Sequence, residues 1–209
     1  MQSTTRGWNV DEGTLFAAYM TKWGPDLPSY TDRIREQFKD EADAVLKLYP
    51  PGSSIEEDKA SFAALFGDEI VSYGGWAWAE RASQSATSQT YRYYFTRRPP
   101  GAPELSVNPL TAPGVYHSAE LYYAWNNLQI RDWPWAAEDR QLADVMSSYW
   151  VNFAKNGNPN ADGLPQWPAY KPGGGGQVMQ LGKDIGASGE THRDRYEYFD
   201  SYYQMAASK

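Results

Sequence analysis

The chain has 209 residues, of which 19 are basic and 26 acidic, so its formal net charge is −7. This acidic balance argues against nucleic acid or an anionic membrane as the main partner, because phosphate contacts need an excess of Lys and Arg. The absence of cysteine excludes disulfides, thiolate metal sites and cysteine nucleophiles. No apolar run approaches the ~18 residues of a membrane span, and no signal-peptide pattern begins the chain, so we expect a soluble protein.

The first fifty residues are predicted to be mainly helical. Residues 7–13, GWNVDEG, are typical of a strand end followed by the cap of a helix that starts near Thr14. Residues 2–6 lack the apolar pattern of a strand that would lead into this segment. A helical period then extends from Asp32 to Tyr49 and ends at the Pro-Pro-Gly that follows.

Two more helices are predicted before the first clear strand. Ser54 precedes an acidic first turn and an apolar stripe, which together predict a short helix that ends at Gly67. Asp68 can cap the next helix. The pair Gly74-Gly75 weakens that helix by about 1 kcal/mol per glycine relative to alanine, so we expect a kink or break there.

The aromatic, β-preferring residues 90–95, TYRYYF, predict a strand. Residues 97–114 contain five prolines and predict a long irregular loop, a kind of segment that is usually functional or disordered. The glycine run 173–176 lacks the Lys-Ser/Thr of a phosphate loop and predicts a surface turn. After the proline-rich loop the pattern predicts a helix near Leu121, a helix over 136–155, a strand over 177–181 and a helix over 193–205.

Only two histidines are available as a general base near neutral pH, His117 and His192. His192 lies in a polar run and is predicted to be a solvated residue at a helix start. His117 lies where the proline-rich loop meets a helix and has aromatic neighbours; taken alone, such a histidine is structural more often than catalytic. Without cysteine or paired ligand spacing we expect neither a metal site nor a cofactor.

The segments around residues 12 and 117 become informative together. GWNVDEGTLF resembles the segment of the type-B carboxylesterase and cholinesterase family that holds the acid of a Ser-His-Glu triad. TYRYYF, the long loop and GVYHSAELYYAW resemble that family's histidine segment, and SSYWVNFAKNGNPN followed by WPAY resembles its late helix and turn. The four motifs occur in the family's order. The resemblance implies an α/β class, the C-terminal part of an α/β-hydrolase fold, mostly helical with a few sheet strands.

The resemblance also implies roles for three residues. Glu12 matches the triad acid, which would hold the imidazole tautomer and stabilise the imidazolium. His117 matches the triad base, which would take the proton of the nucleophile and return it to the leaving alcohol. Glu120, one turn after the histidine, matches a glutamate near the family's site, and a supporting role and a plain helix position remain equally open for it.

The sequence departs from the family in what it lacks. A nucleophile elbow, G-x-S-x-G, and a glycine-rich oxyanion segment are both missing. Ser118 adjoins the proposed base but is not on an elbow, and Ser188 is predicted to lie in a polar loop. We therefore expect residues 1–209 to form the C-terminal portion of an esterase domain. The expected partners are a small-molecule carboxylic ester and the missing N-terminal half of the fold.

Two other classes of function stay open at this point. One is a cholinesterase-like interaction domain without catalysis, since the family includes adhesion proteins. The other is a carbohydrate-binding module that stacks aromatic rings on sugars; Trp133 and Trp135 are its best exposed candidates, whereas Trp78, Tyr149, Phe153, Phe199 and Tyr203 are predicted to lie on core stripes. Without upstream neighbours, the sheet is expected to expose an edge and to favour self-association.

Overall fold

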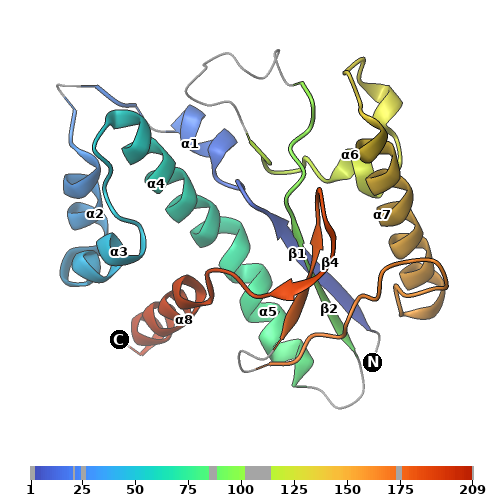
Figure 1. The fold of residues 1–209 in the computed structure, drawn as a ribbon. Coiled ribbons are helices and arrows are strands. Elements are labelled where there is room, and N and C mark those ends of the chain that lie inside the picture. Colours follow the sequence, from blue (N-terminus) through green and yellow to red (C-terminus); the bar gives the residue numbers. More distant parts are fainter. Residues whose placement is uncertain are drawn as a thin grey trace.

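A four-stranded sheet forms the centre of the computed structural model, which describes residues 3–20, 22–24, 27–84, 89–101, 114–172 and 176–208, residues 18–20 by backbone alone. The strands lie in the order β1-β2-β3-β4; the first three are parallel, and β4 pairs antiparallel with β3 (Figure 1). Their bounds are β1 Thr4–Asn9, β2 Thr90–Phe95, β3 Gln177–Leu181 and β4 Ile185–Gly189. Because parallel neighbours need crossover connections, helices cover both faces of the sheet.

Strand β1 corrects the expectation that no strand leads into residues 7–13. All six of its residues pair with β2, from Thr4 opposite Thr90 to Asn9 opposite Phe95. The two β-branched threonines suit a pleated strand, and the pairing satisfies the backbone without an apolar side-chain pattern. Among the described residues β1 pairs only with β2, so it forms one edge of the sheet. Ser188 lies in strand β4 and not in the polar loop expected for it.

The first crossover contains five α-helices. The single helix expected over 32–49 is divided in two, and its cap is Ser29, whose hydroxyl accepts from the Asp32 N–H, so Asp32 is not the cap. The division occurs at Lys39, whose φ of 51° is incompatible with a continuous right-handed helix. The elements are α1 Thr14–Met20, α2 Tyr30–Phe38, a 3₁₀ turn at Lys39–Glu41, α3 Ala42–Leu48, α4 Ile55–Gly67, a π-helical turn at Asp68–Ser72 and α5 Tyr73–Ser83.

Helices α4 and α5 form one continuous rod through the π-helical turn, so the expected end at Gly67 is wrong, and α5 runs through Gly74-Gly75 without a break (Figure 1). Gly67 keeps helical angles, φ −63° and ψ −41°. Its missing side chain serves close packing, because a Cβ there would lie 2.5 Å from the Gly13 nitrogen. A Cβ at Gly75 would lie 3.2 Å from the Trp8 ring. The irregularity is a π-turn, a feature that often marks functional sites.

The second half of the chain follows the sequence prediction more closely. The helix expected over 136–155 is α7, Ala137–Asn156, which ends at Gly157 in the left-handed conformation. The strand expected over 177–181 is β3. The proline-rich loop lies outside the described residues between 102 and 113, as does the glycine run between 173 and 175. The remaining elements are α6 Leu121–Ala124, a 3₁₀ turn at Leu128–Ile130 and α8 Arg193–Ala207.

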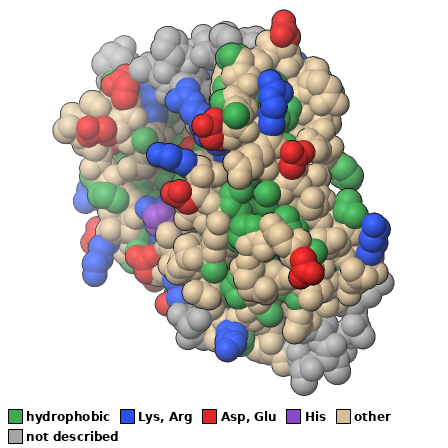
Figure 2. All heavy atoms as spheres, turned by 45° about the vertical axis from the view of Figure 1, so that its right-hand side comes forward, with side chains coloured by type: hydrophobic (Ala, Val, Ile, Leu, Met, Phe, Trp, Pro, Cys, Tyr) green, Lys and Arg blue, Asp and Glu red, His purple; other side chains and the backbone are tan. Residues whose placement is uncertain are grey.

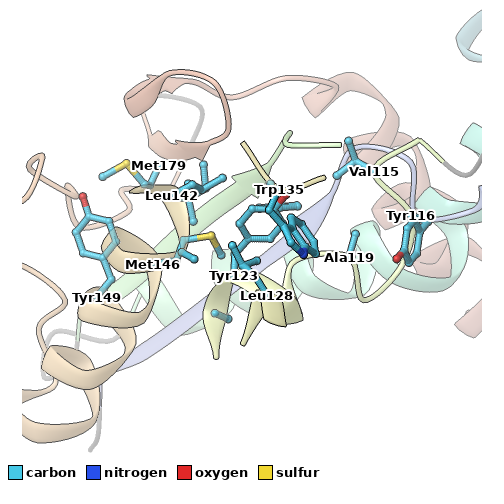
Figure 3. Close-up of a cluster of buried hydrophobic side chains, with 14 of the residues drawn as sticks. Val115, Tyr116, Ala119, Tyr123, Leu128, Trp135, Leu142, Met146, Tyr149 and Met179 are labelled. Carbon is cyan, nitrogen blue, oxygen red and sulfur yellow. The ribbon is translucent and has the colours of Figure 1, made fainter. Parts of the chain in front are cut away.

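The largest core lies between the sheet and the α6–α7 layer (Figure 3). Met179 of the sheet packs in one cluster with side chains of α7 such as Met146 and Tyr149. Trp133 and Trp135 belong to this cluster and are each 8% exposed, so the expectation that they are exposed is wrong. Their rings pack on each other and on Tyr122. Because both rings are buried, they are not available as a surface on which sugars could stack.

The opposite face of the sheet packs on α5 and α8. Arg92 of β2 is fully buried there, and it forms an ion pair with Glu190. Its guanidinium lies 4.7 Å from the Trp8 ring centre and 4.5 Å from that of Tyr170. Of the other aromatics expected in the core, Tyr149 and Phe199 are buried and Phe153 is half-buried. Trp78 and Tyr203 are exposed, at 40% and 37%, so the expectation is wrong for these two.

The molecular face turned forward in Figure 2 carries the α6–α7 side, and hydrophobic side chains gather near its middle. Leu121 and Trp125 lie one helical turn apart, and Trp125 is 70% exposed. Ile130 and Val151 are also exposed on this layer. Within the described part of the chain, no helix has the length and apolar character needed to cross a bilayer.

Candidate functional site

The loops that follow β1 and β2 meet at the carboxyl edge of the sheet, where parallel α/β folds bind ligands. Asp11 forms an isolated parallel bridge with Tyr116. The Asp11 N–H donates to the Val115 carbonyl at 3.2 Å, and the Val115 N–H donates to Asp11 Oδ2 at 2.7 Å. Gly114 has a φ of +56°, and a Cβ there would collide with the Asp11 carboxylate. The two loops are therefore joined by one backbone–backbone and one backbone–carboxylate hydrogen bond next to residues 12 and 117.

Glu12 and His117 are brought into direct contact, although 105 residues separate them in sequence. Glu12 Oε2 lies 2.6 Å from His117 Nδ1. The Glu12 side chain is 5% exposed and the His117 side chain 43% exposed. An ionised carboxylate only accepts hydrogen bonds, so this contact places the proton on Nδ1 and leaves Nε2 unprotonated in the neutral ring. Nε2 has no hydrogen-bond partner among the described residues.

The electrostatics of Glu12 reflect its burial. Desolvation raises the pKa of the Glu12 carboxyl above its ordinary value. The Asn9 N–H, which donates to Glu12 Oε1 at 2.7 Å, and the contact with His117 oppose this rise by favouring the carboxylate. The charge of Glu120 adds to the rise. A partly exposed imidazole thus faces a desolvated carboxylate held by two donors.

Glu120 lies just before α6 and does not contact His117 in any described hydrogen bond. Its Oε2 accepts from Asn9 Nδ2 at 2.6 Å. The same amide donates to the Tyr116 carbonyl at 2.8 Å. Asn9 is thus a site residue that the sequence interpretation did not single out. The signal that could have found it is its place three residues before Glu12 within the N-x-D-E-G motif.

Packing around the pair comes from α1 and α4. The Phe16 ring centre lies 5.3 Å from that of His117. Helix α4 approaches the acid loop at backbone distance, because a Cβ on Gly13 would overlap the Ala63 carbonyl. The turn after the histidine is tight, since Ser118 adopts a φ of 73°. Ser118 follows the isolated bridge at Tyr116 and no strand, so it is not on a strand-to-helix elbow.

A cavity of about 120 Å³ lies behind the acid loop. Glu12 lines it, together with Asp68 of the π-helical turn and His192 and Arg195 at the start of α8. Burial raises the pKa of Asp68, whose carboxylate accepts from the Tyr49 hydroxyl at 2.8 Å. His192 is an exposed residue at the start of α8, as predicted; partial desolvation of its ring, together with the nearby charge of Arg195, lowers its pKa.

The acid and the imidazole can move a proton, but the described residues place no serine elbow beside them. The printed sequence has no G-x-S-x-G. Within the described ranges, no group of three or more His, Asp or Glu is placed to hold a metal ion. The chemistry available is general acid–base catalysis at Nε2 of His117.

Comparisons with known proteins point to one family. Residues 9–199 match the carboxylesterase family. The chain is similar to a fumonisin B1 esterase of Sphingopyxis macrogoltabida, 31% identical over 192 residues, which are 88% of this chain and 33% of that protein. It is similar to liver carboxylesterase 1 of Mus musculus, 29% identical over 79% of this chain and 28% of that protein. Carboxylesterase 1E of Rattus norvegicus is 32% identical over 61% of this chain and 22% of its own length. The chain thus spans a third or less of these relatives.

Proposed function

Since the chain belongs to the carboxylesterase family, we propose that it contributes the acid and the base of a serine carboxylic-ester hydrolase. The observation that carries the proposal is the 2.6 Å contact between Glu12 Oε2 and His117 Nδ1. In this proposal Glu12 is the triad acid and His117 the triad base. The substrate class is a small carboxylic ester, and the reaction transfers its acyl group to water.

The proposed proton path begins at Nε2 of His117. Nε2 takes the hydroxyl proton of a serine as the serine oxygen attacks the ester carbonyl carbon and forms a tetrahedral intermediate. The imidazolium returns this proton to the leaving alcohol as the ester C–O bond breaks, which leaves an acyl-serine. A water molecule then repeats the sequence, and the acid product leaves. Glu12 stays ionised throughout and stabilises the imidazolium.

Glu120 is proposed as a supporting residue. It is bound to Asn9 at 2.6 Å, so its carboxylate is held close to the acid without contacting the imidazole. Its charge acts on Glu12. This arrangement favours a role in holding the acid–base pair over that of a plain helix residue.

We propose residues 1–209 as the C-terminal portion of the domain. In this proposal the nucleophile and the oxyanion donors come from a segment outside these residues. Strand β1 offers the place for it. In the described part of the chain β1 pairs with β2 alone, and the acid loop follows β1 directly. A strand added in parallel beside β1 would end at the same edge as Glu12 and His117. A serine elbow after such a strand would face Nε2.

The test uses the protein encoded with its upstream sequence, assayed on a short-chain nitrophenyl ester. His117→Ala should lower kcat by about 10⁴-fold or more, and Glu12→Gln by about 10⁴-fold. The matched controls are His192→Ala, the chain's other histidine, and Glu56→Gln, an exposed glutamate of α4. Full activity in His117→Ala would overturn the assignment. Absence of G-x-S-x-G from the upstream sequence would also refute it.

Leu121, Trp125 and Ile130 expose apolar side chains, and we propose them as the docking patch of a second candidate function, that of a non-catalytic interaction domain. A docking role for this patch needs no acid–base pair. If the protein with its upstream sequence is inactive on esters and Trp125→Ser abolishes a protein complex that His117→Ala leaves intact, this second function replaces the first. Loss of hydrolysis in His117→Ala with the complex unchanged in Trp125→Ser supports the hydrolase.

A further inference from the structure

We propose that Asn9 is a positioning residue for the acid–base pair, and that it acts through the carboxylate of Glu120. The inference rests on the proposed function, because it assigns Asn9 a role in holding Glu12 and His117. Asn9 ends β1 and is 1% exposed. Its backbone N–H donates to Glu12 Oε1 at 2.7 Å. One residue therefore contacts the acid directly and reaches the histidine loop with its side chain.

The side chain of Asn9 uses both hydrogens of its amide on the histidine loop. Nδ2 donates to the Tyr116 carbonyl at 2.8 Å and to Glu120 Oε2 at 2.6 Å. These two acceptors lie on either side of His117 in sequence, so the amide clamps the loop before and after the base. The bond to Glu120 is charge-assisted and therefore the stronger type.

The residue type matches this task. Two donors on a short side chain are needed, and an amide supplies them. A carboxylate of the same shape supplies none, a hydroxyl supplies one, and glutamine is longer by a methylene group. The backbone of Asn9 lies opposite Phe95, the last residue pair of β1 and β2, so the clamp starts from the rigid end of the sheet.

The clamp also separates two carboxylates. The charges of Glu120 and Glu12 act on each other, since Glu120 raises the pKa of Glu12. An unbound Glu120 carboxylate, only three residues after His117, could compete with Glu12 for the imidazole. Binding to Asn9 Nδ2 holds Glu120 in a fixed place and leaves Nδ1 of His117 to Glu12.

The experiment measures the Nδ1–H proton of His117 in the 209-residue chain by proton NMR. A proton shared with a carboxylate resonates far downfield, and its exchange rate with solvent reports how well the contact is held. His117→Ala and Glu12→Gln assign the signal: the first removes it, and the second accelerates exchange. His192→Ala leaves it unchanged.

Asn9→Asp keeps the shape but removes both donors, so exchange of this proton should accelerate by about tenfold or more, the factor for loss of a hydrogen bond to a charged group. Glu120→Gln alone retains an acceptor for Asn9 and should leave the rate near that of the wild type. Combining Asn9→Asp with Glu120→Gln reverses donor and acceptor in the bond between these two side chains and should restore part of the protection, whereas the bond to the Tyr116 carbonyl stays lost. Ile34→Val, in the separate cluster around α2, controls for a general loss of stability and should not move the signal.

Wild-type exchange in Asn9→Asp would overturn the inference, and so would failure of the double variant to restore protection. If Asn9→Asp does not fold, Glu120→Ala tests the same bond from outside the sheet; it should accelerate exchange, and an unchanged rate would refute the role of Glu120. If Glu12→Gln has no effect on the proton, the acid–base pair and the proposed function fail as well. If Glu12→Gln changes the exchange rate and Asn9→Asp does not, the role proposed for Asn9 fails while the acid–base pair stands.

Discussion

Two alanine substitutions in the α4–α5 rod should change stability in opposite directions. Replacing glycine by alanine inside a helix gains about 1 kcal/mol of helix propensity. At Gly74 a Cβ meets nothing within 4 Å, so Gly74→Ala should stabilise the chain by about 1 kcal/mol. At Gly67 the Cβ would lie 2.5 Å from the Gly13 nitrogen and 3.2 Å from Glu12 Cβ. Backbone cannot move aside as a flexible side chain can, so overpacking there should cost about 3 kcal/mol.

The net loss expected for Gly67→Ala is therefore about 2 kcal/mol, the overpacking cost less the propensity gain. For a chain of this size it corresponds to a fall in Tm of about 4–8 °C, whereas Gly74→Ala should raise Tm by about 2–4 °C. Thermal and urea unfolding followed by circular dichroism measure both. Equal or greater stability of Gly67→Ala compared with Gly74→Ala would refute the idea that α4 contacts the acid loop at backbone distance.

Three further predictions concern charge and burial, the third with a matched control. Burial raises the pKa of Asp68, so the folded state binds the proton of this carboxyl more tightly than the unfolded chain does. Protonated Asp68 therefore adds to the free energy of unfolding below the ordinary pKa of about 3.9, and this stabilisation is lost as pH rises through the folded pKa. Asp68→Asn should flatten that decline in a Tm–pH series, and an unchanged slope would contradict it. Glu190→Gln leaves the buried guanidinium of Arg92 without its counter-charge and should cost about 3–5 kcal/mol in urea unfolding; a loss below about 1 kcal/mol would argue against a buried pair. Trp133→Ala should cost about 3–5 kcal/mol, whereas Trp125→Ala, at an exposed position, should stay within about 0.5 kcal/mol; similar losses would mean that the burial of the two rings is wrongly assigned.

Local patterns predicted the elements that carry a strong sequence signal of their own. Helix α7 has an apolar stripe, acids in its first turn and Gly157 after its end, and its predicted bounds differ from the observed ones by one residue. Strand β2 is rich in aromatic residues and was predicted over the observed residues 90–95. The signal of each lies within the segment itself, although β2 is held in place by pairing with β1 and β3.

Predictions failed where tertiary contacts decide the conformation. Gly67 has the propensity of a helix end, but the acid loop packs against it and the rod continues. Residues 4 and 5 are polar, yet pairing with β2 makes them a strand. Trp133 and Trp135 flank a proline and look like a loop, but they fill the core beside α7. None of these contacts is visible in a sequence window.

The candidate site shows the same contrast between residues that a local motif reveals and residues whose contacts depend on the tertiary fold. Glu12 and His117 were singled out by motif, and the structure places them in contact. Asn9 was missed because the role proposed for it depends on a histidine loop more than 100 residues away. A pattern of residue types can therefore suggest which groups react, but the hydrogen bonds that hold them appear only when the two loops are folded together.

The parallel pairing of β1 and β2 has a consequence for how the acid meets the base. Glu12 lies three residues past the last residue pair of these strands, so strand register sets its height above the sheet relative to the histidine loop. A slip of one residue would displace β1 by about 3.3 Å and turn its side chains to the opposite face, and a slip of two would displace it by about 6.6 Å. Neither is compatible with a 2.6 Å contact. Main-chain pairing at the sheet edge thus sets the distance between Glu12 and His117. A change that loosens β1 can separate the two side chains even though every residue of the candidate site is retained.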